Sequence, residues 1–362
     1  MRDFPNLAPQ LPEPALCATI HPMNWDIIGH EWAVELLREH IRKDSVRHAY
    51  LFVGPPGVGR RTLALRFAQA LNCLQPPAPG EPCGTCRPCR QIERMQHADL
   101  SVVVSEREGK EIKVDQVRQM QHSLSLSPYE ARYRVALLLR FQEANDSTAN
   151  ALLKTLEEPS PRVILLLTAD TVESLLPTIV SRCEVMRLRP LPVERVGQVL
   201  AEKRHLPPET AQQIAHLSGG RMGYALRLAD DGQALEQRQT WVNDLFQLAG
   251  APRRERFAYA ETLNKKFETA RDRDAQREFL RSQLQTWQTI WQDVFHLTAG
   301  VDLPLINLEQ ANTLQRIARQ VDMPTAHRQV DALEYAISGI ERNLNTRLLL
   351  EVLLLDLPRL RL

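Results

Sequence analysis

One glycine-rich stretch, residues 54–62 with the sequence GPPGVGRRT, constrains the fold of this chain more than any other feature. The apolar run Ala49–Val53 precedes it, and the run Leu63–Ala68, which has helix-forming residues, follows it. A strand, a glycine-rich loop and a helix are the context in which backbone N–H groups and the positive end of a helix dipole bind phosphate. The stretch therefore predicts an α/β domain built around a loop of the phosphate-binding type.

The loop departs from the phosphate-binding pattern G-x-x-x-x-G-K-[ST] at the two positions that carry chemistry. Arg60 stands where a lysine would contact the phosphates, and Arg61 stands where a hydroxyl would hold Mg²⁺. Thr62 comes one residue late, so on a helix its side chain points about 100° away from the metal. These departures argue against ATP binding. The residues of this degenerate phosphate loop, which we expect to be non-functional, are Gly54, Gly57, Gly59, Arg60 and Arg61.

The acidic residue that an ATPase needs is also missing. A neighbouring strand should end in a carboxylate that holds Mg²⁺, but the apolar run Val135–Leu139 is followed by Arg140. The first carboxylate is Glu143, which would serve only if the strand continued about three residues beyond its apolar pattern. The sequence therefore predicts a nucleotide-binding scaffold without catalytic parts.

Three continuous apolar runs, at 100–104, 135–139 and 163–167, predict a parallel sheet covered by helices on both faces. After residue 190 the sequence predicts helices only. Helical stripes include Ile28, Trp32, Leu36, Leu37 and Ile41 near the start, and Leu280, Leu284, Trp287 and Trp291 farther on. A last stripe comprises Leu333, Ile337, Ile340, Leu344 and Leu348. The expected division is a leader at 1–22, an α/β domain at 23–189 with an insertion at 73–89, a small helical unit at 190–230 and a helical domain at 231–362.

Composition places the chain among ordinary folded proteins and excludes several classes. Of the 362 residues, 43% are hydrophobic and 25% are charged, and the net charge of +1 argues against tight autonomous DNA binding. No apolar run approaches the roughly 20 residues of a membrane helix. Residues 1–23 contain five prolines and no signal-peptide pattern, so we interpret them as a mobile leader, or as an over-long start with Met23 as the true first residue.

Four of the six cysteines predict a zinc site. Cys73, Cys83, Cys86 and Cys89 lie within a Gly- and Pro-rich insertion, and two-residue spacings let consecutive thiolates converge on one tetrahedral ion. Free buried cysteines are a poor alternative, because the insertion has few apolar residues to bury them. A chain without an export signal is expected in the reducing cytoplasm, which favours metal over disulfides. No open coordination position is indicated, so the zinc should be structural.

Two further segments identify a resemblance. The sequence NALLKTLEEP at 150–159, followed by LLPTIVSRC at 175–183, is similar to the AAA+ proteins of the bacterial DNA polymerase III clamp loader. The four-cysteine insertion is shared by that family's gamma/tau and delta-prime classes, and the degraded loop most resembles the non-hydrolysing delta-prime class. The resemblance covers about residues 25–228, and the sequence NLNTRLLLE at 343–351 is similar to the family's last helix.

The resemblance implies a P-loop AAA+ domain, a helical lid and a C-terminal collar. It implies that Ser181 and Arg182 form the arginine-finger motif, with Arg182 acting on a neighbour's ATP in trans. Thr168 takes the sensor-1 place, and Gly223 stands where hydrolysing members carry a lid arginine. The implied role is that of a stator in a hetero-oligomeric loader with gamma/tau ATPase subunits and the delta subunit. The sliding clamp and primer-template DNA would be met through the assembled complex, without any membrane.

Two alternatives stay open at this stage. The chain could be a hydrolysing gamma/tau-like motor subunit with Arg60 replacing lysine, although a guanidinium fits poorly where a compact ammonium sits. It could also be a stand-alone zinc-dependent DNA-binding module, which near-neutral charge disfavours. Other features are interpreted as structural: Trp241, Trp287 and Trp291 as core, residues 253–256 and 271–274 as solvated faces, and His30 and His48 as neither metal ligands nor catalytic groups.

Overall fold

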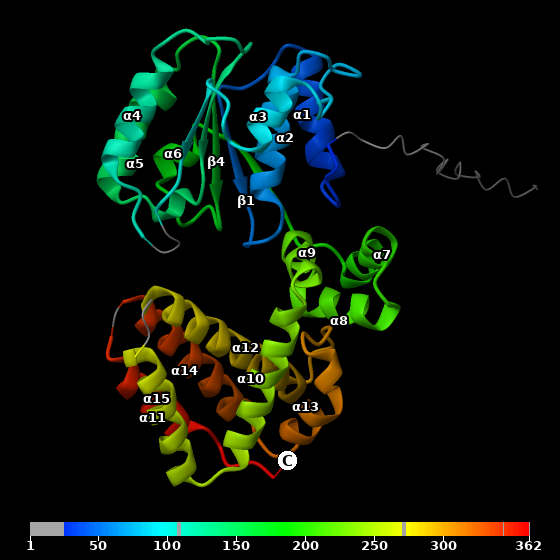
Figure 1. Cartoon of the computed structure of the whole chain (residues 1–362), viewed down its shortest axis with the longest axis vertical. Helices are drawn as coiled ribbons and strands as arrows, with labels where there is room; N and C mark the ends of the chain where they lie inside the picture. The colour runs from blue at the N-terminus through cyan, green and yellow to red at the C-terminus, as the bar shows by residue number, and fades with distance from the viewer. Residues whose placement is uncertain (1–24, 107–109, 270–272, 343, 362) are drawn as a thin grey trace, which may run out of the picture.

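The computed structural model describes residues 25–106, 110–269, 273–342 and 344–361 (Figure 1). The expected leader at 1–22 lies outside the described residues, as do positions 271 and 272 of the expected solvated charge run. The elements in chain order are α1 (Glu31–Arg42), β1 (Ala49–Val53), α2 (Arg60–Asn72), α3 (Arg87–Glu93), β2 (Leu100–Val103), α4 (Val114–Leu124), β3 (Arg134–Leu138), η1 (Phe141–Glu143), α5 (Asp146–Glu157), β4 (Val163–Ala169), α6 (Pro177–Val180), β5 (Glu184–Arg187), α7 (Val193–Arg204), α8 (Pro208–Ser218), α9 (Met222–Asp230), α10 (Gly232–Gly250), α11 (Arg253–Thr269), α12 (Arg273–Ala299), η2 (Leu308–Gln310), α13 (Ala311–Ala318), α14 (Met323–Glu341) and α15 (Thr346–Asp356).

The five strands form one parallel sheet in the order β2-β3-β4-β1-β5. Every residue of β1, β3 and β4 is buried, which is the burial that continuous apolar runs require. The prediction of an α/β fold with a parallel sheet is confirmed. The predicted set of strands was incomplete, because the short edge strand β5 was not expected.

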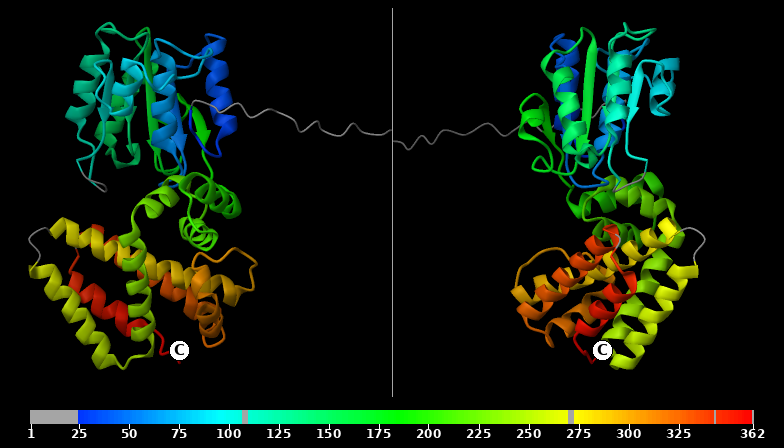
Figure 2. Two further views of the ribbon diagram at one scale, coloured as in Figure 1. Left: turned by 45° about the vertical axis from the view of Figure 1, so that its right-hand side comes forward. Right: turned by 90° about the vertical axis from the view of Figure 1, so that its left-hand side faces the viewer.

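Helices cover both faces of this sheet (Figures 1 and 2). On one face α1 and α2 pack on alternate strand residues such as Tyr50 and Phe52, with Trp25 fully buried among them. On the other face α4, α5 and α6 pack on the residues between, such as Leu51 and Val53. Because the two faces of β1 both carry large apolar side chains, the sheet is fixed in the middle of the domain.

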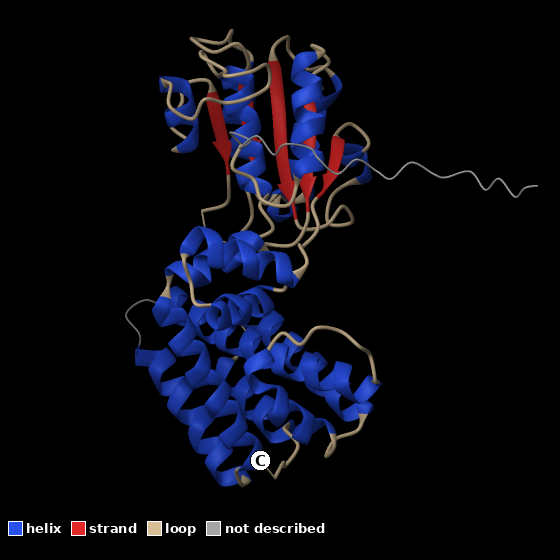
Figure 3. Ribbon diagram, turned by 90° about the vertical axis from the view of Figure 1, so that its right-hand side faces the viewer, coloured by secondary structure: helices blue, strands red, loops and turns tan. Residues whose placement is uncertain are grey.

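The rest of the chain is helical (Figure 3). Helices α7, α8 and α9 have a small core of their own and lie between the sheet domain and the C-terminal helices (Figure 1). Helices α10–α15 share a second large core that includes Leu280, Leu284, Trp287 and Trp291, as the sequence predicted. Among the described residues, no helix is both long enough and apolar enough to cross a membrane.

Two of the predicted helical stripes were partly wrong. Helix α1 begins at Glu31, not near Trp25, and its buried residues are Ala33, Val34 and Leu37. Trp32 is 51% exposed, because the face of α1 that meets the core carries Ala33, Val34 and Leu37 instead. The last stripe is broken because α14 ends at Glu341, and Leu344 and Leu348 are exposed.

One predicted solvated residue is instead a buried link in the C-terminal core. Arg253, Arg254 and Glu255 are exposed, but Arg256 is only 4% exposed. Its guanidinium donates hydrogen bonds to five backbone carbonyls at the C-terminal ends of α10 and α15. These carbonyls belong to Leu248, Ala249, Leu354, Leu357 and Pro358.

Candidate functional site

The degenerate phosphate loop joins β1 to α2 and keeps the backbone form that its glycines allow. Gly54, Gly57 and Gly59 have φ of 155°, 83° and 116°. A Cβ on Gly54 would lie 2.3 Å from the carbonyl oxygen of Leu188, so only glycine fits there. His30 Nε2 lies 3.0 Å from the carbonyl oxygen of Val58 and braces the loop from the start of α1. His30 therefore has a structural contact with the loop.

Arg60 does not project into free space at the start of α2. Its side chain is buried, and its Nη1 lies 2.6 Å from Oδ1 of Asp170, the residue directly after β4. The contact is an ion pair rather than an aligned hydrogen bond, since neither atom has a hydrogen-bond partner among the described residues. The cation that would meet a phosphate is thus neutralised within the chain. Arg61 and Thr62 are exposed.

The end of β3 carries a second internal ion pair where Mg²⁺ would need a carboxylate. Arg140 adopts φ of 51°, and its Nε lies 3.0 Å from Oε1 of Glu143. Ser105 donates to the other oxygen of Glu143 at 2.5 Å, and Arg140 Nη2 donates to Ser105. Thr168, in β4, accepts the backbone N–H of Arg140 at 2.9 Å. Glu143 and Thr168 therefore have local structural partners.

The start of α9 contacts the loop directly. The carbonyl oxygen of Gly57 accepts the backbone N–H groups of Gly223 and Tyr224, at 2.8 and 3.3 Å, at the start of α9. A Cβ on Gly223 would lie 2.8 Å from that oxygen. Arg221 turns away: its Nε donates to the carbonyl of Ser218, and its guanidinium lies 4.8 Å from the ring of Tyr224. Burial lowers the pKa of Arg221.

Ser181 and Arg182, for which the resemblance implies a finger role, lie directly after α6. Arg182 is part-exposed, and its Nη1 donates to the carbonyl of Thr178 at 2.8 Å. Its Nη2 lies 2.7 Å from Oε1 of Glu157, the last residue of α5. Ser181 donates to the carbonyl of Thr178 at 3.1 Å. Burial raises the pKa of the adjacent Cys183 thiol to about 12, so it stays protonated.

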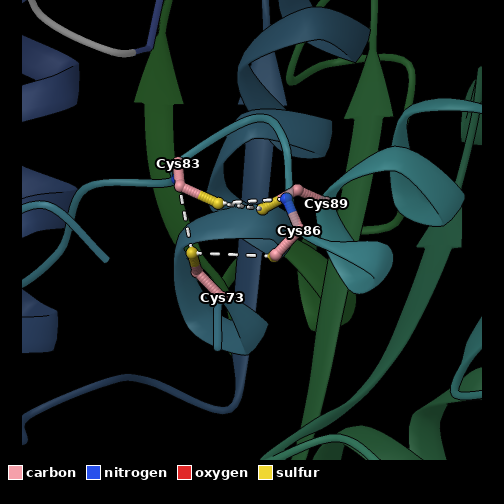
Figure 4. A group of neighbouring side chains, drawn as sticks. All are labelled: Cys73, Cys83, Cys86 and Cys89. Carbon is pink, nitrogen blue, oxygen red and sulfur yellow. Dashed lines mark hydrogen bonds between the residues drawn. The ribbon is translucent and has the colours of Figure 1, made fainter. Parts of the chain in front are cut away.

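The four cysteines of the insertion converge as predicted (Figure 4). Their Sγ atoms all lie within 4.8 Å of one another, and the pairs Cys73–Cys86 and Cys83–Cys89 are each 4.0 Å apart. Tetrahedral zinc with Zn–S bonds of about 2.3 Å requires S···S separations of about 3.8 Å, whereas a disulfide requires about 2.05 Å. All four are free thiols. The arrangement fits a metal ion of the zinc type.

Backbone donors support the cysteine cluster. The N–H of Cys83 points to Cys73 Sγ at 3.3 Å, and the N–H of Cys86 points to Cys83 Sγ at 3.2 Å. Burial acts to raise the pKa of Cys83, but hydrogen bonds from Cys86 and Thr85 outweigh it and lower the pKa to about 6. Burial raises the pKa of Cys89 and of Cys73. The insertion is also fixed to the segment before α1, because Trp25 Nε1 donates to the carbonyl of Gly80 at 3.0 Å.

Sequence reasoning did not identify Asp170 or Glu157 as partners of the two key arginines. Asp170 had a usable signal, because it follows a buried parallel strand and therefore lies at the edge where the loop begins. Glu157 stands inside the family-like segment at 150–159, but its spacing to Arg182 along the chain gives no indication of contact. The domain limits and the roles of Ser181 and Arg182 remain predictions.

Comparisons with known proteins assign the family. A family model described as "DNA polymerase III, delta subunit" matches residues 29–192, and one described as "DNA polymerase III, delta subunit, C terminal" matches residues 233–359. The DNA polymerase III subunit delta' of Bacillus subtilis is 28% identical over 324 residues, which is 90% of this chain and 94% of the relative. The subunit delta' of Pseudomonas aeruginosa is 38% identical over 200 residues, 54% of this chain and 59% of that protein.

Other relatives are named as tau or gamma subunits. The DNA polymerase III subunit tau of Escherichia coli is 32% identical over 223 residues, which is 59% of this chain and 34% of that protein. A solved structure of a gamma subunit-related protein from Thermotoga maritima is 19% identical with a TM-score of 0.45, covering 91% of this chain and 99% of that one, and adds nothing to the assignment. Both family models are described as delta subunits, and the Bacillus subtilis relative, covered over 94% of its length, is named as a delta' subunit. These names agree with the class that the degenerate loop at residues 54–62 most resembles. The chain belongs to the delta-prime family of bacterial DNA polymerase III clamp-loader subunits.

Proposed function

We propose that this chain is the non-hydrolysing stator of its clamp loader and supplies Arg182 to the ATP site of a neighbouring subunit. The observation that carries this proposal is the ion pair of Arg60 with Asp170. In this pair Asp170 neutralises, within the chain, the positive charge that a phosphate loop would otherwise offer to ATP. The pairing of Arg140 with Glu143 supports the same conclusion at the place of the Mg²⁺-binding acid.

The proposed finger has the chemistry that the role needs. A guanidinium stays charged and binds phosphate oxygens through two parallel donors. Arg182 lies directly after the short helix α6 and pairs with Glu157 at the end of α5, in a contact that is partly exposed to solvent. An ion pair of that kind contributes little stability, so a triphosphate from a neighbouring subunit can replace the carboxylate.

We assign a structural zinc ion to Cys73, Cys83, Cys86 and Cys89. Four thiolates close the coordination shell, so the ion would have no open position for substrate. Its role would be to fold the insertion at 73–89, where Leu74 is 67% exposed and few residues are buried. Thiolates bind the metal best, and the backbone N–H groups directed at Cys73 and Cys83 favour that form.

The assembly would join gamma/tau ATPase subunits and the delta subunit in a hetero-oligomer in the cytoplasm. We assign the α/β domain to residues 23–189, the lid to 190–230 and the oligomerising collar to 231–362. Three exposed apolar residues on or just before α15, with spacing of four, suit a subunit contact in the collar. They are Leu344, Leu348 and Val352. The sliding clamp and primer-template DNA would be engaged by the assembled complex.

The decisive experiment has two arms. Equilibrium titration of the purified chain with ATP and Mg²⁺ should give no binding up to millimolar concentration. In the reconstituted loader, Arg182→Ala should leave assembly intact and reduce DNA-stimulated ATPase by about 10³-fold at the site it serves. Arg118→Ala, at an exposed arginine of α4 paired with Asp115, is the matched control and should leave the rate unchanged.

The contrary outcomes separate the proposal from its rival. Unchanged ATPase in the Arg182→Ala loader removes the finger role. Binding of ATP by the isolated chain, with turnover that disappears in Glu143→Gln, would instead support a hydrolysing motor subunit of the gamma/tau kind.

A further inference from the structure

A cleft of about 320 Å³ lies along α3, just beyond the four-cysteine cluster, and its lining is strongly basic. It is lined by Arg87, Arg90, Gln91, Arg94 and Gln96. The three arginines stand at i, i+3 and i+7, which places them on one face of a helix. Arg87, Arg90 and Arg94 are all exposed. None of them belongs to the phosphate loop, the finger or the metal ligands.

The positive charge of this cleft is little compensated. Glu93 is the acidic residue of α3, and it turns to α2, where Arg66 and Gln69 bind it at 2.7 and 2.8 Å. Arg87 has one loose ion pair, at 3.8 Å to Glu130. Within the described part of the chain, the side chains of Arg90 and Arg94 have no ion pair or hydrogen bond. Guanidinium groups in this state are available for phosphate oxygens.

An exposed aromatic residue stands on the rigid loop that contacts Arg87 through Glu130. Tyr129, directly before Glu130, is 81% exposed. The loop is fixed because buried Asp99 accepts the backbone N–H groups of Tyr129, Glu130 and Ala131 at 2.7, 2.9 and 3.0 Å. Glu130 in turn approaches Arg87 and, at 3.6 Å, His97. A rigid exposed ring beside a basic track is the combination that binds unpaired bases by stacking and their backbone by charge.

We propose that the α3 cleft and Tyr129 form a direct binding site for single-stranded nucleic acid. Arg87, Arg90 and Arg94 contact successive phosphates, Gln91 and Gln96 donate hydrogen bonds, and Tyr129 stacks on a base. The site lies outside the proposed finger role and does not depend on it. Two other features favour a nucleic acid over an acidic protein: the arginines follow one line, and the large exposed ring would have little to pack on in a chain of carboxylates.

The net charge of +1 fits a weak local site rather than tight binding. Binding of about three phosphates without sequence reading should give a dissociation constant of roughly 10⁻⁴–10⁻⁶ M that weakens with salt. Such a site adds one contact with nucleic acid to those of a larger complex and does not bind nucleic acid tightly by itself.

The test is fluorescence anisotropy of labelled oligo-dT, about 20 nucleotides long, titrated with the zinc-loaded full chain at several salt concentrations. The double variant Arg90→Ala/Arg94→Ala should bind about tenfold more weakly, and its salt slope should fall by about 1.4, or 0.7 for each lost phosphate contact. Tyr129→Leu should weaken binding by about fivefold or more with the salt slope unchanged.

The matched control is Arg316→Ala/Arg319→Ala, which removes the same charge from exposed positions on and just after α13. It should bind like the parent chain, and zinc content should be equal in all variants. Absence of oligo-dT binding at low salt, or an equal loss in the control, overturns the proposal. So does tighter binding of polyglutamate that depends on Arg90 and Arg94, which would assign the cleft to an acidic protein. Duplex DNA that binds as tightly, with no effect of Tyr129→Leu, overturns the single-strand preference.

Discussion

Arg60 and Asp170 join the first turn of α2 to the end of β4, with 2.6 Å between Nη1 and Oδ1. They link two elements that meet at the edge of the sheet where a nucleotide would bind. The pair therefore connects the loop to the sheet within the chain itself. The loop keeps its glycine-dependent shape because its backbone still packs against Leu188 and α9.

The first prediction concerns this pair. Arg60→Ala and Asp170→Ala should each lower the free energy of unfolding of the α/β domain, and a double-mutant cycle should give a coupling of about 1–2 kcal/mol. The value lies below that of a fully buried pair because the Asp170 side chain is 37% exposed. Chemical denaturation measures it. Arg60→Lys should still bind no ATP; a coupling near zero, or ATP binding by that variant, would contradict this account.

The contact between the loop and α9 gives a steric prediction. Gly223→Ala places a Cβ 2.8 Å from the carbonyl of Gly57 and should destabilise the chain by about 1–3 kcal/mol. Gly232→Ala is the control, because a Cβ there meets nothing within 4 Å, and it should be neutral or stabilising by up to about 1 kcal/mol. Thermal unfolding of both variants measures the difference. Equal effects would mean that α9 does not rest on the loop.

The cysteine cluster predicts metal content and local folding. The purified chain should contain one zinc ion, and Cys83→Ser should abolish it, because three thiolates from a loop without a core bind weakly. Cys183→Ser is the control, since that thiol lies outside the cluster, and it should keep the ion. Metal analysis together with limited proteolysis of residues 73–89 checks both statements. A metal-free chain that resists proteolysis there would exclude a structural zinc.

Local patterns in the sequence predicted much of this molecule. The buried strands were recognisable because β1, β3 and β4 lie under helices on both faces and therefore consist of apolar residues throughout. The cysteines were recognisable because their spacing along the chain itself brings the thiolates together. Strand β5 was missed because an edge strand with the sequence EVMR is only partly buried and lacks such a run.

Pairings over long sequence separations could not be predicted in this way. Arg60 meets a carboxylate 110 positions away, and Arg256 meets carbonyls about 100 positions away in the last turn of α15. A charge run at 253–256 has the same composition whether it is solvated or buried. Only the packing of α10, α11 and α15 decides that one of its arginines is enclosed.

Asp99 predicts a dependence of stability on acid. Burial alone would raise its pKa, but the N–H groups of residues 129–131 and the guanidinium of Arg134 outweigh burial and lower the pKa. A lowered pKa in the folded state adds stability above the unfolded value of about 3.9, and this stability is lost as pH falls through the lower folded value. Asp99→Asn should therefore be less stable at pH 7 and less sensitive to acid below about pH 4. Denaturation midpoints from pH 2 to 7 test this; parallel curves would contradict it.

The last prediction concerns Arg256, the buried residue that joins α10, α11 and α15. Its five donors meet carbonyls at the C-terminal ends of two helices, where a cation also opposes the negative end of each dipole. Burial lowers its pKa, but a guanidinium remains charged near neutral pH. Removing it leaves several carbonyls without donors, so Arg256→Ala should cost about 3 kcal/mol.

The experiment compares Arg256→Ala with Arg254→Ala, an exposed arginine two residues earlier that should change stability by less than about 0.5 kcal/mol. Arg256→Lys should fall between them, since an ammonium has three donors and cannot span both helix ends. Chemical denaturation of the full chain, followed through the unfolding of the C-terminal helices, measures these changes in the free energy of unfolding. If the collar assembles subunits through α15, only Arg256→Ala should also weaken incorporation into the loader, because it alone releases the end of that helix. Equal stability of the 254 and 256 variants would show that the guanidinium is not the link.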